Sequence, residues 1–376
     1  MSMRWKGGFI QTWFDPLTPG STITWGGLWS WGVNNQGQLG LNNTTYYSSP
    51  KQVGTLTNWL SVSCSRYHTV SIKTDGTLWS WGKNSYGQLG LGDITNRSSP
   101  VQVGSLTNWS SVSCGQFNTV SIKTDGTLWS WGRNDQGQLG LGNTTYYSSP
   151  KQVGALTNWS SVSCGQYHTV SIKTDGTLWS WGYNYFGELG LGNKTNYSSP
   201  KQVGALTNWL SVACGYQHTV SIKTDGTLWS WGYNTYGQLG LGNVTNYSSP
   251  KQVGALTNWL SVSCGYMHMV SIKTNGTLWS WGGSGSGQLG LGNVTPYSSP
   301  KQVGVLTNWL SVSCGKYHTV SIKTDGTLWS WGKNSYGQLG QGNTTNYSSP
   351  KQVGALTSWT NLFKSCTTYS TLAITS

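Results

Sequence analysis

Residues that commonly perform catalysis recur along this chain at a fixed spacing of 50 residues. A serine and an aspartate accompany nearly every histidine, so no single Ser–His–Asp triad stands out as an active site would. We therefore interpret the histidines as structural groups that bond nearby backbone at a strand start, and we predict a protein that is not an enzyme and has no cofactor. The repeated position holds His68, His168, His218, His268 and His318, with Asn118 and Ser370 in the two other units.

Cysteine also falls once in each unit, which argues against a disulfide framework. Equivalent positions in different units do not come within the roughly 7 Å between Cα atoms that a disulfide needs. We expect small buried thiols, and no C-x-x-C pair predicts zinc. The segment from Gly285 to Gly290 matches G-x-G-x-x-G by chance, since no helix follows it. The cysteines are Cys64, Cys114, Cys164, Cys214, Cys264, Cys314 and Cys366.

The same spacing governs the whole chain, and this regularity predicts the architecture. LWSWG begins at every fiftieth residue from Leu28 to Leu328, and SSP ends at every fiftieth residue from Pro50 to Pro350. A period of this length is typical of a solenoid or a propeller, and the pattern inside one unit decides between them.

Each unit reads as four short β-strands. His68–Thr74 is rich in β-branched residues, Asp75-Gly76 supplies a hairpin turn, and Thr77–Gly82 returns. Pro50–Gly54 and Trp59–Cys64 read as two further strands, and nothing has helical periodicity. Four antiparallel strands per unit predict an all-β fold, a seven-bladed β-propeller of four-stranded blades.

The two ends of the chain complete each other. TTYSTLAITS after Cys366 aligns with the end of the preceding unit, and Trp25 stands where Asp75 does. Residues 25–376 thus hold seven 50-residue units plus a two-residue insertion. We predict a closing blade shared by the N- and C-terminal half-units, which removes the free sheet edges, preceded by an arm of residues 1–24.

These motifs carry a family resemblance. CGxxHTVSIKTDGTLWSWGxNxxGQLGLG followed by SSPxQV closely resembles the repeat of the regulator-of-chromosome-condensation family. The resemblance implies a seven-bladed propeller with a shared closing blade. The founding member is a guanine-nucleotide exchange factor with chromatin docking, and it carries an inserted β-wedge and a basic tail. Uniform 50-residue units leave no room for a β-wedge, and the only basic residues of the arm are Arg4 and Lys6. Exchange activity or chromatin binding is therefore an alternative and not the preferred function.

Composition and charge limit the class of protein and the kinds of binding partner that this chain can have. Charged residues are 8% and aromatic residues 13% of the chain, which excludes disorder. The net charge of +13 comes from 22 basic against 9 acidic residues, so acid is scarce, no basic run occurs, and a nucleic-acid partner is not indicated. No apolar run approaches the roughly 20 residues of a membrane-spanning helix, and the N-terminus does not resemble a signal peptide.

The units differ mainly in the loop within CGxxH and in the loop after LWSWG. Strand directions place both loops at the end of the blade opposite the Asp-Gly hairpins, and their tyrosines favour recognition. Drift of solvated loops is the alternative explanation. The residues that we predict to bind a ligand are Lys83, Tyr86, Arg133, Tyr183, Phe186, Tyr233, Tyr236, Lys333, Tyr336, Arg66, Tyr67, Tyr167, Tyr216, Tyr266 and Tyr317.

The N-terminal arm is apolar, and we predict that it anchors the ring to a larger assembly through Trp5, Phe9, Ile10, Trp13 and Phe14. Its KGGFI start weakly resembles leaders of environmental bacteriophage structural proteins. We therefore predict a virion accessory protein of tail or capsid, or otherwise a cytoplasmic one, that contacts other virion proteins and presents the loops to a surface glycan or receptor. A multivalent lectin with weak sites on several blades is a further alternative.

Overall fold

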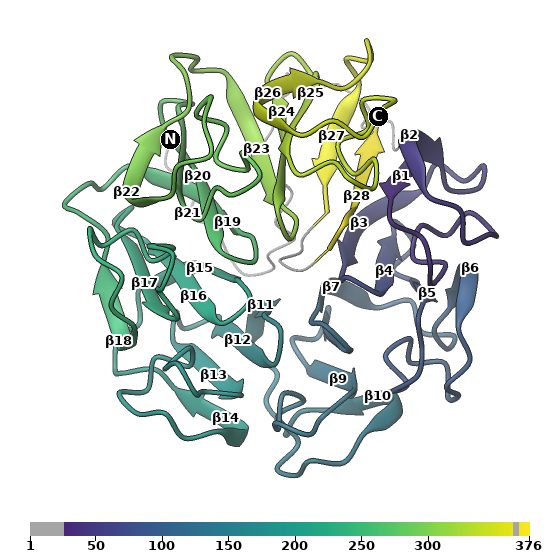
Figure 1. The fold of residues 1–376 in the computed structure, drawn as a ribbon. Helices are drawn as coiled ribbons and strands as arrows, with labels where there is room; N and C mark the ends of the chain where they lie inside the picture. The colour runs from purple at the N-terminus through teal and green to yellow at the C-terminus, as the bar shows by residue number, and fades with distance from the viewer. Residues whose placement is uncertain (1–25, 364–367) are drawn as a thin grey trace, which may run out of the picture.

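A computed structural model describes residues 26–363 and 368–376 of the chain. These residues form 28 strands and no helix. The strands make seven four-stranded antiparallel sheets that stand as blades around a central axis (Figure 1). The predicted all-β seven-bladed propeller is confirmed.

Blade 1 shows the plan of every blade. From the axis outward it contains β3 (Trp59–Cys64), β4 (His68–Lys73), β5 (Leu78–Gly82) and β6 (Arg97–Gln102). Blade 2 contains β7 (Trp109–Cys114), β8 (Asn118–Lys123), β9 (Leu128–Gly132) and β10 (Tyr147–Gln152), and blade 3 contains β11 (Trp159–Cys164), β12 (His168–Lys173), β13 (Leu178–Gly182) and β14 (Tyr197–Gln202). Blade 4 contains β15 (Trp209–Cys214), β16 (His218–Lys223), β17 (Leu228–Gly232) and β18 (Tyr247–Gln252), blade 5 contains β19 (Trp259–Cys264), β20 (His268–Lys273), β21 (Leu278–Gly282) and β22 (Tyr297–Gln302), and blade 6 contains β23 (Trp309–Cys314), β24 (His318–Lys323), β25 (Leu328–Gly332) and β26 (Tyr347–Gln352).

Blade 7 joins the two ends of the chain. Its order is β27 (Trp359–Leu362), β28 (Ser370–Thr375), β1 (Leu28–Gly32) and β2 (Tyr47–Gln52), again from the axis outward. β1 and β28 pair from Leu28↔Ile374 to Gly32↔Ser370 without a break. The predicted shared blade is therefore confirmed, with the C-terminal half supplying the two inner strands.

The outer strand differs from its predicted bounds. We expected Pro50–Gly54, whereas β2 begins at Tyr47 and ends at Gln52, with a register shift opposite Ser30 and Gly32. A proline is tolerated there because the outer strand lies at the sheet edge, where its missing N–H breaks no ladder. Similarly, the strand predicted as His68–Thr74 ends at Lys73.

Neighbouring blades pack through an apolar core and are joined by a hydrogen bond, and both features repeat around the ring. Val70, Ile72 and Leu78 of blade 1 pack with Trp109 and Trp131 of blade 2 in one buried cluster. The Trp131 indole Nε1 also donates to the Gln88 backbone carbonyl at 3.0 Å. The same bond joins blade 6 to blade 7, from Trp31 to the Gln338 carbonyl. LWSWG and GQLG are thus the two halves of one joint between blades.

Residues 1–25 and 364–367 lie outside the described residues, and with them the predicted arm residues Trp5, Phe9, Ile10, Trp13 and Phe14. The six described cysteines are buried, as the sequence predicted for them.

Candidate binding face

The two variable loops lie side by side at one end of every blade. In blade 1 they are residues 65–67 between β3 and β4 and residues 83–96 between β5 and β6. The Lys83 backbone N–H donates to the Tyr67 carbonyl at 2.8 Å, and Arg133 and Phe117 repeat this bond in blade 2. We call this end the loop face and the end with the Asp-Gly hairpins the hairpin face. All fifteen residues predicted to bind a ligand lie on the loop face.

The loops form concentric circles around the axis. At four blade junctions, the residue two places after the cysteine donates its N–H to the carbonyl of its counterpart in the next blade, for example Gln166 to Tyr216 at 3.2 Å and Lys316 to Thr368 at 2.7 Å. Backbone bonds between blades therefore fix the inner circle, and its side chains are free to differ from blade to blade.

Aromatic side chains of these loops form three groups of ring contacts, which Arg66 and Arg133 link by cation–π contacts and which we together call the aromatic belt. Tyr67 stacks on Phe117 with ring centres 4.9 Å apart, and Tyr86 meets Phe117 edge to face at 5.0 Å. Across the face, Phe186 meets Tyr233 at 4.7 Å. Further ring contacts join Tyr167 to Tyr183, Tyr183 to Tyr185, Tyr233 to Tyr236, Tyr216 to Tyr266, Tyr266 to Tyr317, Tyr317 to Tyr369, and Tyr336 to Tyr369. The structure thus brings the predicted tyrosines together into one surface.

Several members of this surface were not in the predicted set, among them Tyr46 and Tyr146, which contact Tyr336 and Tyr86. Phe117, Tyr185, Lys316 and Tyr369 contact predicted residues. Phe117, Lys316 and Tyr369 occupy the same repeat positions as Tyr67 and Arg66, so extending the pattern to every unit would have found them. Tyr185 is 62% exposed and lies at a position that we did not compare between units.

Charge is spread unevenly over the loop face. Arg133 pairs with Asp135 at 2.7 Å, which lowers the net charge of blade 2. Arg66, Lys83, Lys316 and Lys333 all lie in blades 1 and 6, on either side of blade 7. Glu188 stands in blade 3 where six other units carry glutamine, and burial raises its pKa to about 8. The carboxyl is therefore largely protonated at neutral pH.

The repeated histidines bond differently from our prediction. We expected bonds to nearby backbone, but the His168 Nε2 lies 3.1 Å from the Thr219 Oγ1 in the next blade. A Cβ at Gly165 would lie 2.2 Å from the His168 Cε1, which explains the glycine of CGxxH. Burial lowers the pKa of His168 to about 3, so it is a neutral joint between blades. The prediction was wrong because the partner lies 51 residues away in sequence.

Within residues 26–363 and 368–376, no three His, Cys, Asp or Glu side chains gather as metal ligands would. Over the same ranges, no helix is long and apolar enough to cross a membrane.

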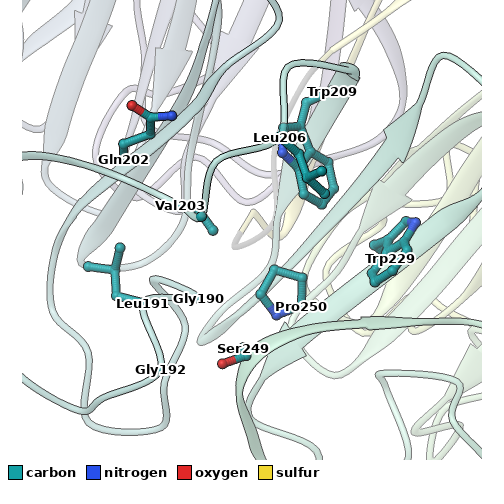
Figure 2. A pocket seen from close by; sticks show the side chains of 11 residues that line it. Gly190, Leu191, Gly192, Gln202, Val203, Leu206, Trp209, Trp229, Ser249 and Pro250 are labelled. Carbon is teal, nitrogen blue, oxygen red and sulfur yellow. The ribbon is translucent and has the colours of Figure 1, made fainter.

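Grooves occur where blades meet. One of about 360 Å³ lies between blades 3 and 4, lined by Leu206, Trp209, Trp229 and Pro250 among others (Figure 2). A second, of about 390 Å³, lies between blades 6 and 7 with an equivalent lining. The Lys223 Nζ lies 3.7 Å from the Trp229 ring centre and covers one of its faces. These grooves follow from how the repeated blades pack.

Comparison with known proteins agrees with the blade plan and the repeat motifs. The model of the RCC1-like domain matches residues 23–221, and the model of the regulator of chromosome condensation (RCC1) repeat matches residues 225–272, 275–322 and 325–371. The chain belongs to this family of propellers. No match was found among curated protein sequences.

Two solved structures share the fold over nearly their whole length. Prp20p from Saccharomyces cerevisiae, described with its binding properties to Gsp1p and histones, is 20% identical with a TM-score of 0.85, covering 94% of this chain and 92% of that protein. Human WBSCR16 is 22% identical with a TM-score of 0.83, covering 93% of this chain and 98% of that protein. At these identities the likeness establishes the fold.

Proposed function

We propose that this chain is a non-catalytic binding propeller that recognises its partner through the loop face. The observation that carries the proposal is the aromatic belt. Tyrosine, phenylalanine, arginine and lysine gather on loops that vary between blades, while the strands beneath them repeat almost unchanged. Tyrosine and arginine give large contact energy in binding surfaces, and a rigid ring holds them in place before the partner arrives.

The hairpin face is suited to a different contact. One leucine per blade lies there, next to the residue that packs on the hairpin, and each is between 46% and 49% exposed. The seven are Leu56, Leu106, Leu156, Leu206, Leu256, Leu306 and Leu356. A repeated ring of exposed leucines favours docking onto another surface. We propose that this face, with the N-terminal arm, attaches the ring to an assembly such as a virion.

Two other candidates draw on particular observations. The grooves at the blade junctions carry tryptophans, which favours a lectin with several weak sugar sites. The fold shared with Prp20p, a protein described with its binding properties to Gsp1p, favours an exchange factor for a small GTPase. A panel of immobilised glycans tests the first, and nucleotide release from a small GTPase tests the second.

Two variants separate the two faces. Replacing Tyr86, Tyr183, Tyr233 and Tyr336 with serine should leave attachment to the assembly intact and weaken binding to the target surface. Removing residues 1–20 should leave a folded ring that no longer joins the assembly, since the described ring does not include them. Pull-downs with purified particles and with host surface material measure both effects. If the tyrosine variant binds its target normally, the loop face is not the recognition surface.

A further inference from the structure

Three cations converge on one aromatic ring where the propeller closes. The Arg66 Cζ, the Lys316 Nζ and the Lys333 Nζ lie 5.4, 5.1 and 5.7 Å from the centre of the Tyr369 ring. We call these four residues the closing-blade cluster. Lys83 lies beside it, 5.2 Å from the Tyr67 ring that Arg66 also contacts.

Among the residues that the structure describes, no carboxylate forms an ion pair with this cluster. In the described residues, the ion pairs within 4 Å are Arg97–Asp93 and Arg133–Asp135, and neither involves the cluster. Like charges held this close repel one another. Burial, and then the charges of Arg66 and Lys333, lower the pKa of Lys316 to about 8. The cluster is therefore a site where bound negative charge would be stabilised.

The cluster also supplies neutral donors. The centre of the Tyr317 ring lies 5.3 Å from the Lys316 Nζ, and this ring also contacts the Tyr369 ring. Burial raises the pKa of both tyrosines, so their hydroxyls remain protonated at neutral pH. Ammonium, guanidinium and phenol donors together match the oxygens of a phosphate or sulfate group.

Most of the unpaired positive charge of the loops lies in a short arc of the face, and the cations outside this arc are Lys194 of blade 3 and Arg133 of blade 2, which pairs with Asp135. At the position of Arg66 and Lys316, the blades between them carry Gln116, Gln166, Tyr216 and Tyr266. At the position of Lys333, blades 3, 4 and 5 carry Tyr183, Tyr233 and Gly283. A long polyanion would need cations along an extended track, so this arc fits a compact anion.

We propose that the closing-blade cluster is a binding site for a compact, multiply charged oxyanion, a phosphate or sulfate group carried by the ligand of the loop face. The inference rests on the proposed function, because it assigns an anionic group to that ligand. The tyrosine-rich blades 3 and 4 would then contact the uncharged remainder of the same ligand.

The chain's own repeats supply substitutions that its fold accepts. Arg66→Gln and Lys316→Gln introduce the residue of blades 2 and 3, and Lys333→Tyr introduces the residue of blades 3 and 4. Lys151→Val is the matched control: it removes one positive charge from the exposed outer strand of blade 2 and introduces the residue that blade 1 carries as Val101.

The experiment is calorimetric titration of the full chain and of each variant with inorganic phosphate and with inorganic sulfate, at physiological ionic strength. We expect saturable binding of phosphate, sulfate or both, weakened about tenfold or more by each cluster substitution and unchanged by Lys151→Val. Which ion binds more tightly tells a phosphate ligand from a sulfate ligand. Absence of saturable binding, or equal loss in Lys151→Val, would overturn the proposal.

Two further outcomes are decisive. A single-stranded oligonucleotide or a sulfated oligosaccharide that binds far more tightly than either ion, with an equal loss in Arg133→Tyr, would show an extended polyanion site and overturn the compact one. If the wild-type chain binds neither ion but its target is still lost in the four-tyrosine variant, the anion site fails while the proposed function stands.

Discussion

The loop face and the hairpin face lie at opposite ends of the same strands, but they differ in how closely their side chains repeat from blade to blade. At the hairpin face, Asp75 Oδ1 accepts bonds from the Thr77 N–H and hydroxyl at 2.9 and 2.6 Å, and the Trp79 indole donates to that hydroxyl at 2.8 Å. Nearly every blade repeats this network, and Asn275 replaces the aspartate with the same bonds. The loop face has a repeated network of its own, in which the Asn84 Oδ1 accepts from the Leu89 N–H and the Gln88 Oε1 accepts from the Tyr86 N–H, both at 2.9 Å. At the variable positions within CGxxH and after LWSWG, however, only the backbone bonds repeat, and the side chains change from blade to blade.

This difference shows where the fold restricts the sequence. Hairpin residues contact the next blade, and a Cβ on Gly126 would lie 2.1 Å from the Thr157 carbonyl oxygen. The variable side chains of the loop face extend from a backbone that is already held by bonds between strands and blades. They can therefore change without altering the joint between neighbouring blades. We infer that stability depends on the hairpins, strands and buried joints, and that recognition depends on the loop face.

The largest expected effect comes from breaking the ring that both faces share. Deleting residues 359–376 removes β27 and β28, leaving β1 without its inner partner and uncovering remaining members of the same buried cluster, such as Leu28 and Ile322. We expect loss of cooperative unfolding or a sharply lower melting temperature by circular dichroism. An unchanged melting temperature would refute the shared blade.

The next largest expected effect is a loss of folding stability at acidic pH, caused by the buried histidines that join neighbouring blades beneath the loop face. Burial lowers the pKa of the five histidines to about 3 from an ordinary value of 6.5. The unfolded chain thus binds more protons below pH 6.5, so stability is full above that pH and falls as pH drops toward 3. We expect each histidine to contribute about 1.4 kcal/mol of loss per pH unit in this window.

Chemical unfolding between pH 7.5 and 4.5 measures this slope. His168→Asn, which copies Asn118 of blade 2, should reduce the slope by the equivalent of one proton. A slope that does not change in the variant would mean that other groups cause the acid sensitivity.

Substituting alanine for a hairpin glycine, and for a glycine with open space around it, tests whether packing restricts the hairpin face. Gly126→Ala places a Cβ against the Thr157 carbonyl at a φ of +76°, whereas Gly104 has a φ of +61° and nothing within 4 Å of the added atom. We expect Gly126→Ala to lower the unfolding free energy by about 3 kcal/mol or more, and Gly104→Ala by about 1 kcal/mol, the cost of the left-handed conformation alone. Equal losses in urea denaturation would contradict the packing argument.

The last expected effect in this series is a gain in stability, at a buried group below the loop face. Because burial raises the Glu188 pKa to about 8 from 4.5, its stabilising contribution is full below pH 4.5 and is lost as pH rises through 8. Glu188→Gln copies six other units, and we expect it to raise the unfolding free energy by up to about 3 kcal/mol at pH 7. This gain should vanish at pH 4.5, and a gain that persists there would show that ionisation is not its cause.

Much of the fold was predictable because the repeat makes local patterns unambiguous. Trp59–Cys64 has its predicted bounds, and the match between the chain ends predicted the closing blade. The outer strand was misplaced because a proline, which ordinarily interrupts strands, lies inside an edge strand.

The candidate site was predictable as a face but not as a cluster. Comparing units shows that Arg66 and Lys316 are unusual, but they lie 250 residues apart in sequence. Only closure of the ring places blades 6, 7 and 1 together, so their shared contact with Tyr369 could not be predicted from the units alone. The histidine joints were missed for a similar reason, since each bond crosses to the next blade.

The division between a restricted framework and a free loop face is tested most directly by one scan. A library of single substitutions through residues 26–376, displayed and sorted for resistance to trypsin, measures how each position affects the folded state. We predict that Arg66, Tyr86, Tyr183, Tyr233 and Lys333 accept most residues, whereas Gly126, Trp131 and the buried histidines accept few. If these five loop-face positions accept as few residues as the hairpin positions do, the account is contradicted, because their side chains would then serve the fold.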